Sequence, residues 1–117
     1  MRPGTVVSAP GLKLPLTELA AGDVLVGSPR AGSVELGVVG GAEVGVWEMT
    51  AGVARDTEED EILVVLSGHA TVRIEGGHSV DLKAGDVMRL ESGSRTTWTV
   101  HEPLRKVYIT PTQSQEC

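Results

Sequence analysis

The sequence predicts an all-β fold, a small antiparallel barrel built from short strands. Its 117 residues include fifteen glycines, six prolines, three aromatic residues and no phenylalanine, a composition that suits β-branched strands and tight turns better than helices. Short apolar stretches are each closed by glycine, as at Gly68 and at Gly85-Asp86, which is typical of strands that end in turns. A chain of this length encloses one hydrophobic core, so we expect a single barrel domain over residues 16–110.

The first fifteen residues are expected to form an extended arm, because they carry three prolines and two glycines with weak periodicity. In a barrel this small, a neighbouring subunit's sheet edge is one candidate position for the arm. Residues 16–20 fit one helical turn or part of a loop, and residues 23–26 fit a short strand. At the other end, residues 111–117 are expected to form a polar tail.

The middle of the chain predicts a hairpin followed by an acidic loop. Residues 33–39 and 42–49 read as two strands hinged at Gly40-Gly41, a dipeptide that tolerates the positive φ of a tight hairpin. Residues 50–60 are polar and are expected to be irregular, with the acidic run at residues 58–60 in solvent. Glu61 differs, because it begins a strand over residues 61–66 whose two faces are both apolar, so we expect that strand to be covered on both sides.

The remaining strands follow the glycine turn at Gly68. Residues 69–75 and 79–83 predict a second hairpin, with Ala70, Val72 and Ile74 facing inward. The last two strands are expected at residues 94–101 and 104–109, and Pro103 should end pairing between them. Lys106 and Tyr108 are two apart on the closing strand and must therefore face the same way.

Charge and cysteine content exclude several classes of protein. The net charge is −6 and the ten basic residues are scattered, whereas phosphate-backbone binding needs clustered positive charge, so nucleic acid is not an expected partner. The only cysteine is Cys117, which cannot close an internal disulfide. No leader sequence or long apolar run marks secretion or membrane insertion, so we expect a cytoplasmic protein without a membrane partner.

Three stretches in order carry a resemblance to a known family. They are Gly45-Val-Trp-Glu48, then Asp60-Glu61 with Val65-Leu-Ser-Gly68, then Gly85-Asp86 with Gly93, Thr97-Trp98 and Arg105-Lys-Val-Tyr108. Over residues 24–109 the chain resembles the cupin superfamily. Within it, the chain is similar to the small single-domain cupins grouped with the cupin domain of (S)-ureidoglycine aminohydrolase and with ethanolamine-utilisation cupins. The resemblance implies a jelly-roll-like β-barrel with a small-molecule pocket at one mouth, and a homodimer.

The chain departs from that family at the metal-binding positions. The family's first motif has two histidines shortly before a glutamate that lies seven residues ahead of a glycine, and Glu61 and Gly68 fit that interval. The histidine positions then fall on Arg55 and Thr57, and the third, in the second motif, falls on Thr96. One carboxylate with hydroxyl groups is a poor site for zinc, iron or manganese. We therefore expect no tightly bound metal and no cofactor.

The three histidines that are present do not replace these ligands. His69 and His101 lie on faces expected to point outward, and His78 lies in a turn.

The pocket is then left with organic side chains. Glu61 is the candidate acid or base, because apolar surroundings favour a neutral carboxyl group that can exchange a proton near neutral pH. If they face inward, Lys106 and Tyr108 would act beside it. Candidate substrate-binding residues are Trp47, Arg55, Thr57, Thr96 and Trp98.

Each of these assignments has an alternative. Arg55 or Lys106 could pair with Glu61, which would make the carboxylate a binding clamp or a purely structural ion pair. The two tryptophans could fill the core instead of contacting a substrate.

Two functions of different classes fit these residues. One is a metal-independent enzyme that performs acid/base chemistry, such as isomerisation, elimination or hydrolysis, on a small polar metabolite. The other is a ligand-binding or accessory cupin without catalysis. The resemblance to ureidoglycine aminohydrolase implies ureides and amines as substrates, but that activity depends on a metal within the family, so it is the least favoured alternative.

Overall fold

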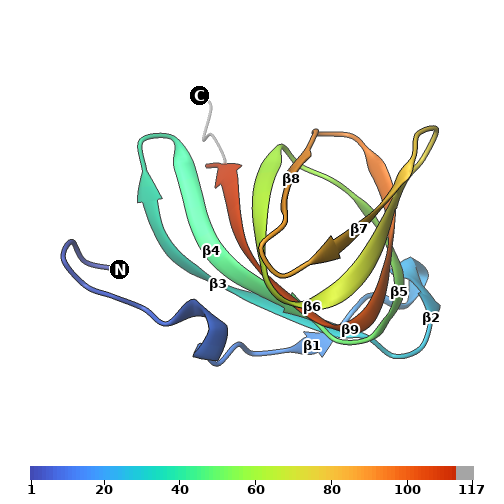
Figure 1. Ribbon diagram of the computed structural model, residues 1–117, viewed down its shortest axis with the longest axis horizontal. Helices are drawn as coiled ribbons and strands as arrows, with labels where there is room; N and C mark the ends of the chain where they lie inside the picture. The colour runs from blue at the N-terminus through green and yellow to red at the C-terminus, as the bar shows by residue number, and fades with distance from the viewer. Residues whose placement is uncertain (113–117) are drawn as a thin grey trace.

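The structure, a computed structural model, describes residues 1–112 and confirms the all-β antiparallel prediction. Nine strands form one curled sheet, open on one side, that encloses the core as a half-barrel (Figure 1). The strands are β1 (Thr17–Glu18), β2 (Val24–Val26), β3 (Arg30–Val39), β4 (Ala42–Met49), β5 (Gly52–Thr57), β6 (Glu61–Ile74), β7 (Ser79–Lys83), β8 (Val87–Leu90) and β9 (Arg95–Pro111).

Helical structure is limited to two short 3₁₀ turns, η1 (Ala9–Gly11) and η2 (Ala21–Asp23), among the described residues. Neither approaches the length or the apolar character that a membrane-crossing helix needs.

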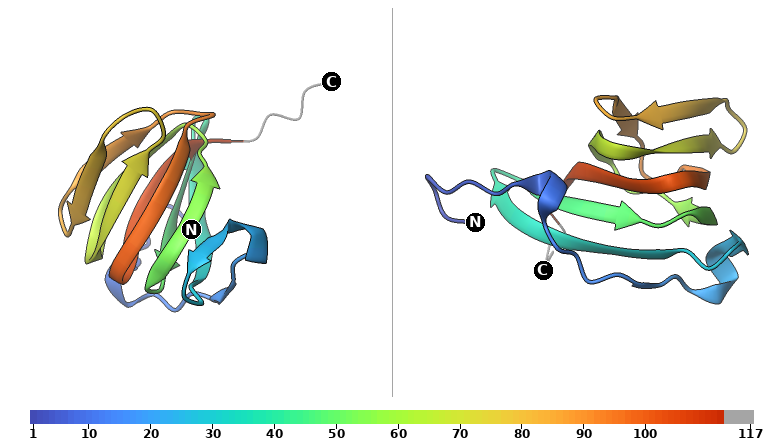
Figure 2. Two further views of the ribbon diagram at one scale, coloured as in Figure 1. Left: turned by 90° about the vertical axis from the view of Figure 1, so that its right-hand side faces the viewer. Right: turned by 60° about the horizontal axis from the view of Figure 1, so that its bottom comes forward.

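Two long strands, β6 and β9, pair with each other and run through both halves of the sheet. In the first half, β9 pairs on its other side with β4, and β6 pairs with β8. In the second half, β9 pairs with β5, and β6 pairs with β7. β3 extends the first half beyond β4, and β2 extends the second beyond β5. Figure 2 shows the same strands side by side in one curled sheet, from two further directions.

The strand breaks expected at Gly68 and Pro103 are wrong, because both strands continue through these positions. Gly68 has φ +91, the left-handed region that favours glycine. A Cβ at Gly68 would overlap the carbonyl oxygen of Pro103 on the paired strand. Register shifts cluster here between residues 65 and 70. The glycine therefore marks a bend shared by two continuous strands, at the junction of the two halves of the sheet.

Two other local predictions also need correction. Residues 50–60 are not irregular throughout, because they contain β5, which pairs with β2 and β9. Residues 16–20 contain β1, an edge strand on β3, in place of the alternative helical turn. The hairpin hinged at Gly40-Gly41 is confirmed by β3 and β4, and Gly40 has φ +61.

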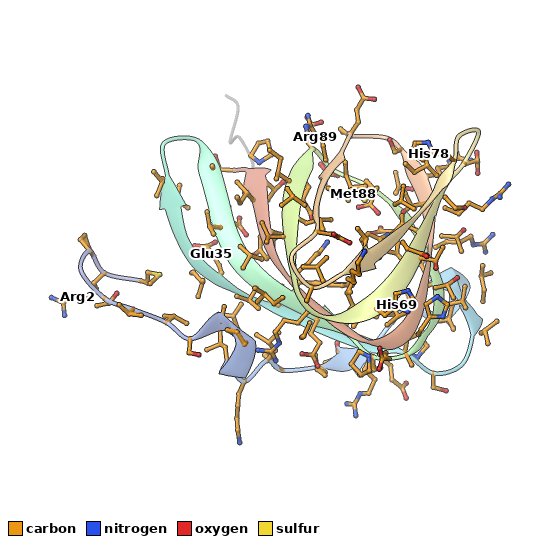
Figure 3. All side chains as sticks on the ribbon, viewed as in Figure 1. Arg2, Glu35, His69, His78, Met88 and Arg89 are labelled. Carbon is orange, nitrogen blue, oxygen red and sulfur yellow. The ribbon has the colours of Figure 1, made fainter. Side chains whose placement is uncertain are left out.

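The core lies inside the curl and is built by alternate residues of both halves. Leu63, Val65, Ala70 and Val72 of β6 are all buried there. The expectation that the first half of β6 is covered on both sides is wrong for Ile62, which is 43% exposed on the convex face. Figure 3 shows the alternation on β8, where Met88 points into the curl and Arg89 away from it.

The part of the N-terminal arm around η1 lies against the convex face of the chain's own sheet (Figure 1). A position at a neighbouring subunit's sheet edge stays a prediction. The Nη1 atom of Arg105 donates to the carbonyl oxygens of Ala9 and Leu12, at 2.9 and 2.5 Å. The backbone of the arm also passes so close to Gly32 that a Cβ there would overlap the carbonyl oxygen of Pro15. Most of the expected polar tail, including Cys117, lies outside the described residues, and Pro111 is the last residue of β9.

Candidate functional site

Inner-face residues of β4, β5, β6 and β9 converge on a cavity of about 420 Å³. This volume is in the range of pockets that hold small molecules. Seven of the eight predicted site residues line it, and the eighth, Thr96, is buried beside it. The lining residues are Leu19, Asp23, Ser33, Glu43, Trp47, Met49, Ala54, Arg55, Asp56, Thr57, Glu58, Glu59, Glu61, Trp98, Lys106, Tyr108 and Thr110.

A buried ion pair lies at the centre of the lining. The Nζ atom of Lys106 lies 2.6 Å from Oε2 of Glu61, and Lys106 is only 6% exposed. The same ammonium lies 4.6 Å from the ring centroid of Trp47 and 5.1 Å from that of Trp98, within the range of cation–π attraction. Of the two sequence-based alternatives for Glu61, this geometry favours a carboxylate clamped by Lys106 over an unpaired acid.

Tyr108 lies next to this pair on the same face of β9 and contacts a second carboxylate. Its hydroxyl donates to Oε2 of Glu43 at 2.8 Å. The ring lies over Gly45, where a Cβ would overlap it, so the glycine makes room for the phenol. Burial, and then the hydrogen bond to Glu43, raise the pKa of Tyr108 well above its ordinary value. Its hydroxyl therefore stays protonated and serves as a hydrogen-bond donor, not as a base.

Glu58 is part of the site, and its assignment to a solvated loop is wrong. It is 5% exposed and accepts hydrogen bonds from Oγ1 of Thr96 at 2.6 Å and from Nε1 of Trp98 at 2.9 Å. The signal in the sequence was the period of two from Ala54 through residue 56 to Glu58, which places all three on one face of an extended chain.

Asp56 is a second residue that the sequence interpretation missed. It lies opposite Thr96 in the β5–β9 register, on the inner face, and lines the cavity. Desolvation, and then the charge of Glu58, raise the pKa of Asp56 to about 6, although a backbone hydrogen bond from Thr57 opposes the shift. A carboxyl group with this pKa can gain or lose a proton near neutral pH.

Arg55 and Thr57 point the other way. In the register they lie opposite Thr97 and Arg95 on the outer face of the sheet, although both also line the cavity. The Nη2 atom of Arg55 donates to the carbonyl oxygen of Gly22 at 3.3 Å. The inner face at this point is formed by the residues one position earlier, Ala54 and Asp56.

The donors present do not fit a transition metal. Within residues 1–112, no three histidine, cysteine, aspartate or glutamate side chains are grouped so that they could hold an ion. The histidines lie elsewhere: His69 and His101 stack on each other with ring centroids 4.6 Å apart, and His78 lies beside the β6–β7 turn (Figure 3). Glu61, the carboxylate of the motif, already binds an ammonium group. We therefore assign no chemical step to a metal.

Residues 36–108 match the family model of the EutQ-like cupin domain, which is more than half of the chain. The chain belongs to this cupin family. The prediction of a small cupin of the ethanolamine-utilisation-like group is thereby confirmed. No curated protein matches this EutQ-like cupin.

Solved structures share the fold of this EutQ-like cupin. The EutQ protein of Clostridium difficile is 22% identical with a TM-score of 0.69, over 91% of this chain and 85% of that one. A putative ethanolamine utilization protein Q of Salmonella typhimurium LT2 is 24% identical with a TM-score of 0.62, over 85% and 95%. A protein of unknown function of the DUF861 family from Pseudomonas syringae is 20% identical with a TM-score of 0.72, over 85% of this chain but only 44% of its own.

Proposed function

We propose that this cupin binds a small polar metabolite in its cavity without a metal ion. The observation that carries the proposal is the cavity itself: about 420 Å³ stays unfilled beside a buried Lys106–Glu61 pair and two indole walls. Apolar walls with a few fixed polar groups are the usual arrangement of a small-molecule site. The ion pair is held by its own partners, so it acts as an orienting feature of the wall.

The charges on the inner face favour a ligand with a cationic group, such as an amine. Six carboxylates line the cavity against the ammonium of Lys106 and the guanidinium of Arg55. Four of the six lie around Lys106, on Glu43, Asp56, Glu58 and Glu61. Three of the four accept a hydrogen bond from a neighbouring side chain. Among the described side chains Asp56 has no such partner, so of these four carboxylates it is the one available to a ligand.

Two structures with the same fold carry names that refer to EutQ or to ethanolamine utilization. Those names are consistent with an amine but concern the other proteins.

Catalysis by proton transfer is the second candidate, and the raised pKa of Asp56 favours it. In this scheme Asp56 takes the place that the sequence assigned to Glu61, because Glu61 is bound to Lys106. An isomerisation, elimination or hydrolysis would use Asp56 as acid or base and the hydroxyl of Tyr108 as a donor, if a ligand displaces Glu43 from it. Proton exchange by a positioned carboxyl group contributes about 10²–10⁴-fold to a rate.

Thermal denaturation with a panel of small amines and carboxylates tests the binding proposal. A ligand at about 100 times its Kd adds about 2.7 kcal/mol to stability. We expect ethanolamine or another small amine to raise the melting temperature in a saturable way, and Asp56→Asn to remove the effect. The exposed Glu91→Gln variant loses the same charge outside the cavity and should keep it. The proposal would be contradicted if no amine raised the melting temperature in a saturable way, or if the rise persisted in Asp56→Asn.

Product analysis separates the two candidate functions. Incubation of the best ligand with the protein, followed by NMR of the ligand, gives new resonances if the cupin is an enzyme and an unchanged spectrum if it only binds. The homodimer is likewise a proposal, based on the resemblance alone, and analytical ultracentrifugation measures it.

A further inference from the structure

A second groove, of about 550 Å³, adjoins the cavity. It crosses the ends of β5, β6 and β9, between η2 and the β6–β7 turn, and its lining is polar. The lining residues are Gly22, Asp23, Arg55, Asp56, Thr57, Arg73, Glu75, Gly76, Arg95, Thr96 and Thr97.

Three of the seven arginines of the chain line this one groove: Arg55, Arg73 and Arg95. Arg55 lies opposite Thr97 in the β5–β9 register, and Thr97 lies opposite Arg73 in the β6–β9 register. Arg95 lies two residues before Thr97 on β9, so its side chain is on the same face of the sheet. The three guanidinium groups therefore come from adjacent strands on one face, where like charges destabilise a sheet unless something neutralises them.

The structure does not supply that neutralisation by direct ion pairs. The two arginine ion pairs within residues 1–112 are Arg89 with Asp60 and Arg105 with Glu48, neither of them in the groove. Three carboxylates also line the groove, on Asp23, Asp56 and Glu75, but none lies within 4.0 Å of a groove arginine among the described residues. The lining therefore carries three positive and three negative formal charges, but the three guanidinium groups are not held by ion pairs with described residues of the groove and are available to a ligand.

We propose that this groove is an oxyanion site, in which Arg55, Arg73 and Arg95 bind a phosphate or carboxylate group of a small molecule. Guanidinium groups present planar pairs of N–H donors that match the oxygens of either group. The groove is open at Gly22 and Gly76, where a Cβ would have no atom within 4 Å, and the hydroxyl of Thr97 adds a donor. The site does not depend on a ligand in the cavity, so it goes beyond the function proposed above.

Isothermal titration calorimetry with inorganic pyrophosphate and with citrate, at matched ionic strength, tests the site and separates its two oxyanion classes. We expect saturable binding of at least one anion. Arg73→Gln and Arg95→Gln should each weaken it about tenfold, the usual effect of one charge-assisted contact. The three groove arginines are exposed, so these variants should keep the melting temperature of the parent. Glu75→Gln removes a competing carboxylate and should strengthen binding.

Arg2→Gln is the matched control, because Arg2 lies on the N-terminal arm, far from the groove (Figure 3), and its loss changes the net charge equally. It should bind the anion as the parent does. Two results would overturn the site: no saturable binding of either anion, or equal weakening by Arg2→Gln and by the groove variants, which would indicate an effect of net charge alone.

Discussion

Replacement of Lys106 by methionine isolates the buried ion pair. Methionine keeps an unbranched apolar stem against the two indoles but removes the ammonium, and so leaves the Glu61 carboxylate unpaired where the two side chains are only 7% and 13% exposed. Removal of one partner from a buried pair costs about 3–5 kcal/mol. Protonation sets an upper limit, because neutralising a carboxyl group of ordinary pKa, about 4.3, costs about 3.7 kcal/mol at pH 7. We expect Lys106→Met to lose about 3 kcal/mol at pH 7.

The pH dependence tests the reasoning directly. At pH 5 the same neutralisation costs about 1 kcal/mol, so the difference between Lys106→Met and the parent should shrink as the pH falls. Urea denaturation at pH 7 and pH 5 measures it. The double variant Lys106→Met/Glu61→Gln has no unpaired charge and should recover much of the stability that Lys106→Met loses. Lys83→Met breaks the exposed pair with Asp86 and should cost less than about 1 kcal/mol. A loss below about 1 kcal/mol for Lys106→Met, or one that does not depend on pH, would refute the argument.

Three other perturbations have expected outcomes. Because the pKa of Asp56 is raised to about 6 from 3.8, its protonation stabilises the folded state at low pH, and this contribution is lost as the pH rises through 6. Melting curves of Asp56→Asn should therefore exceed the parent at pH 7 and match it at pH 4. Gly68→Ala and Gly85→Ala share the strain of positive φ, but only residue 68 also meets the Pro103 carbonyl. Denaturation should show a loss of more than about 2 kcal/mol for Gly68→Ala and a smaller one for Gly85→Ala. Elemental analysis of the purified protein should find no stoichiometric zinc, iron or manganese; a full equivalent would contradict the assignment of a metal-free site.

The fold could be predicted from the sequence because its turns are marked by glycine and its faces by alternation. Glycine gave a wrong prediction at Gly68, where the strand bends but does not end. A glycine with positive φ closes a turn in one setting and permits a kinked strand in another. Only the close approach of Gly68 and Pro103 distinguishes these cases, and that contact joins residues far apart in the sequence. The sequence did not predict β5, because its outward side chains Arg55 and Thr57 are polar and make the segment resemble a loop.

The candidate site was predicted in part, for a related reason. The orientation of Lys106 and Tyr108 follows from the spacing of two, but whether that face is the inner one depends on pairing with β4 and β6. The interval of the family motif points to Arg55 and Thr57, which line the cavity, but alternate residues of a strand face opposite sides, and a shift of one residue changes the face. Asp56 and Glu58 therefore lie on the inner face, next to the positions that the motif indicates.

The sharing of β6 and β9 between the two halves also governs how the molecule should unfold. Neither half has a complete set of neighbours without these two strands, so melting one half would strip hydrogen-bond partners from the other. Pairing between residues 62–74 and 96–109 also joins distant parts of the chain, a pattern associated with slow folding. Amide exchange in the centre of both strands should accordingly require opening of the whole molecule, with one free energy common to both ends of the curl.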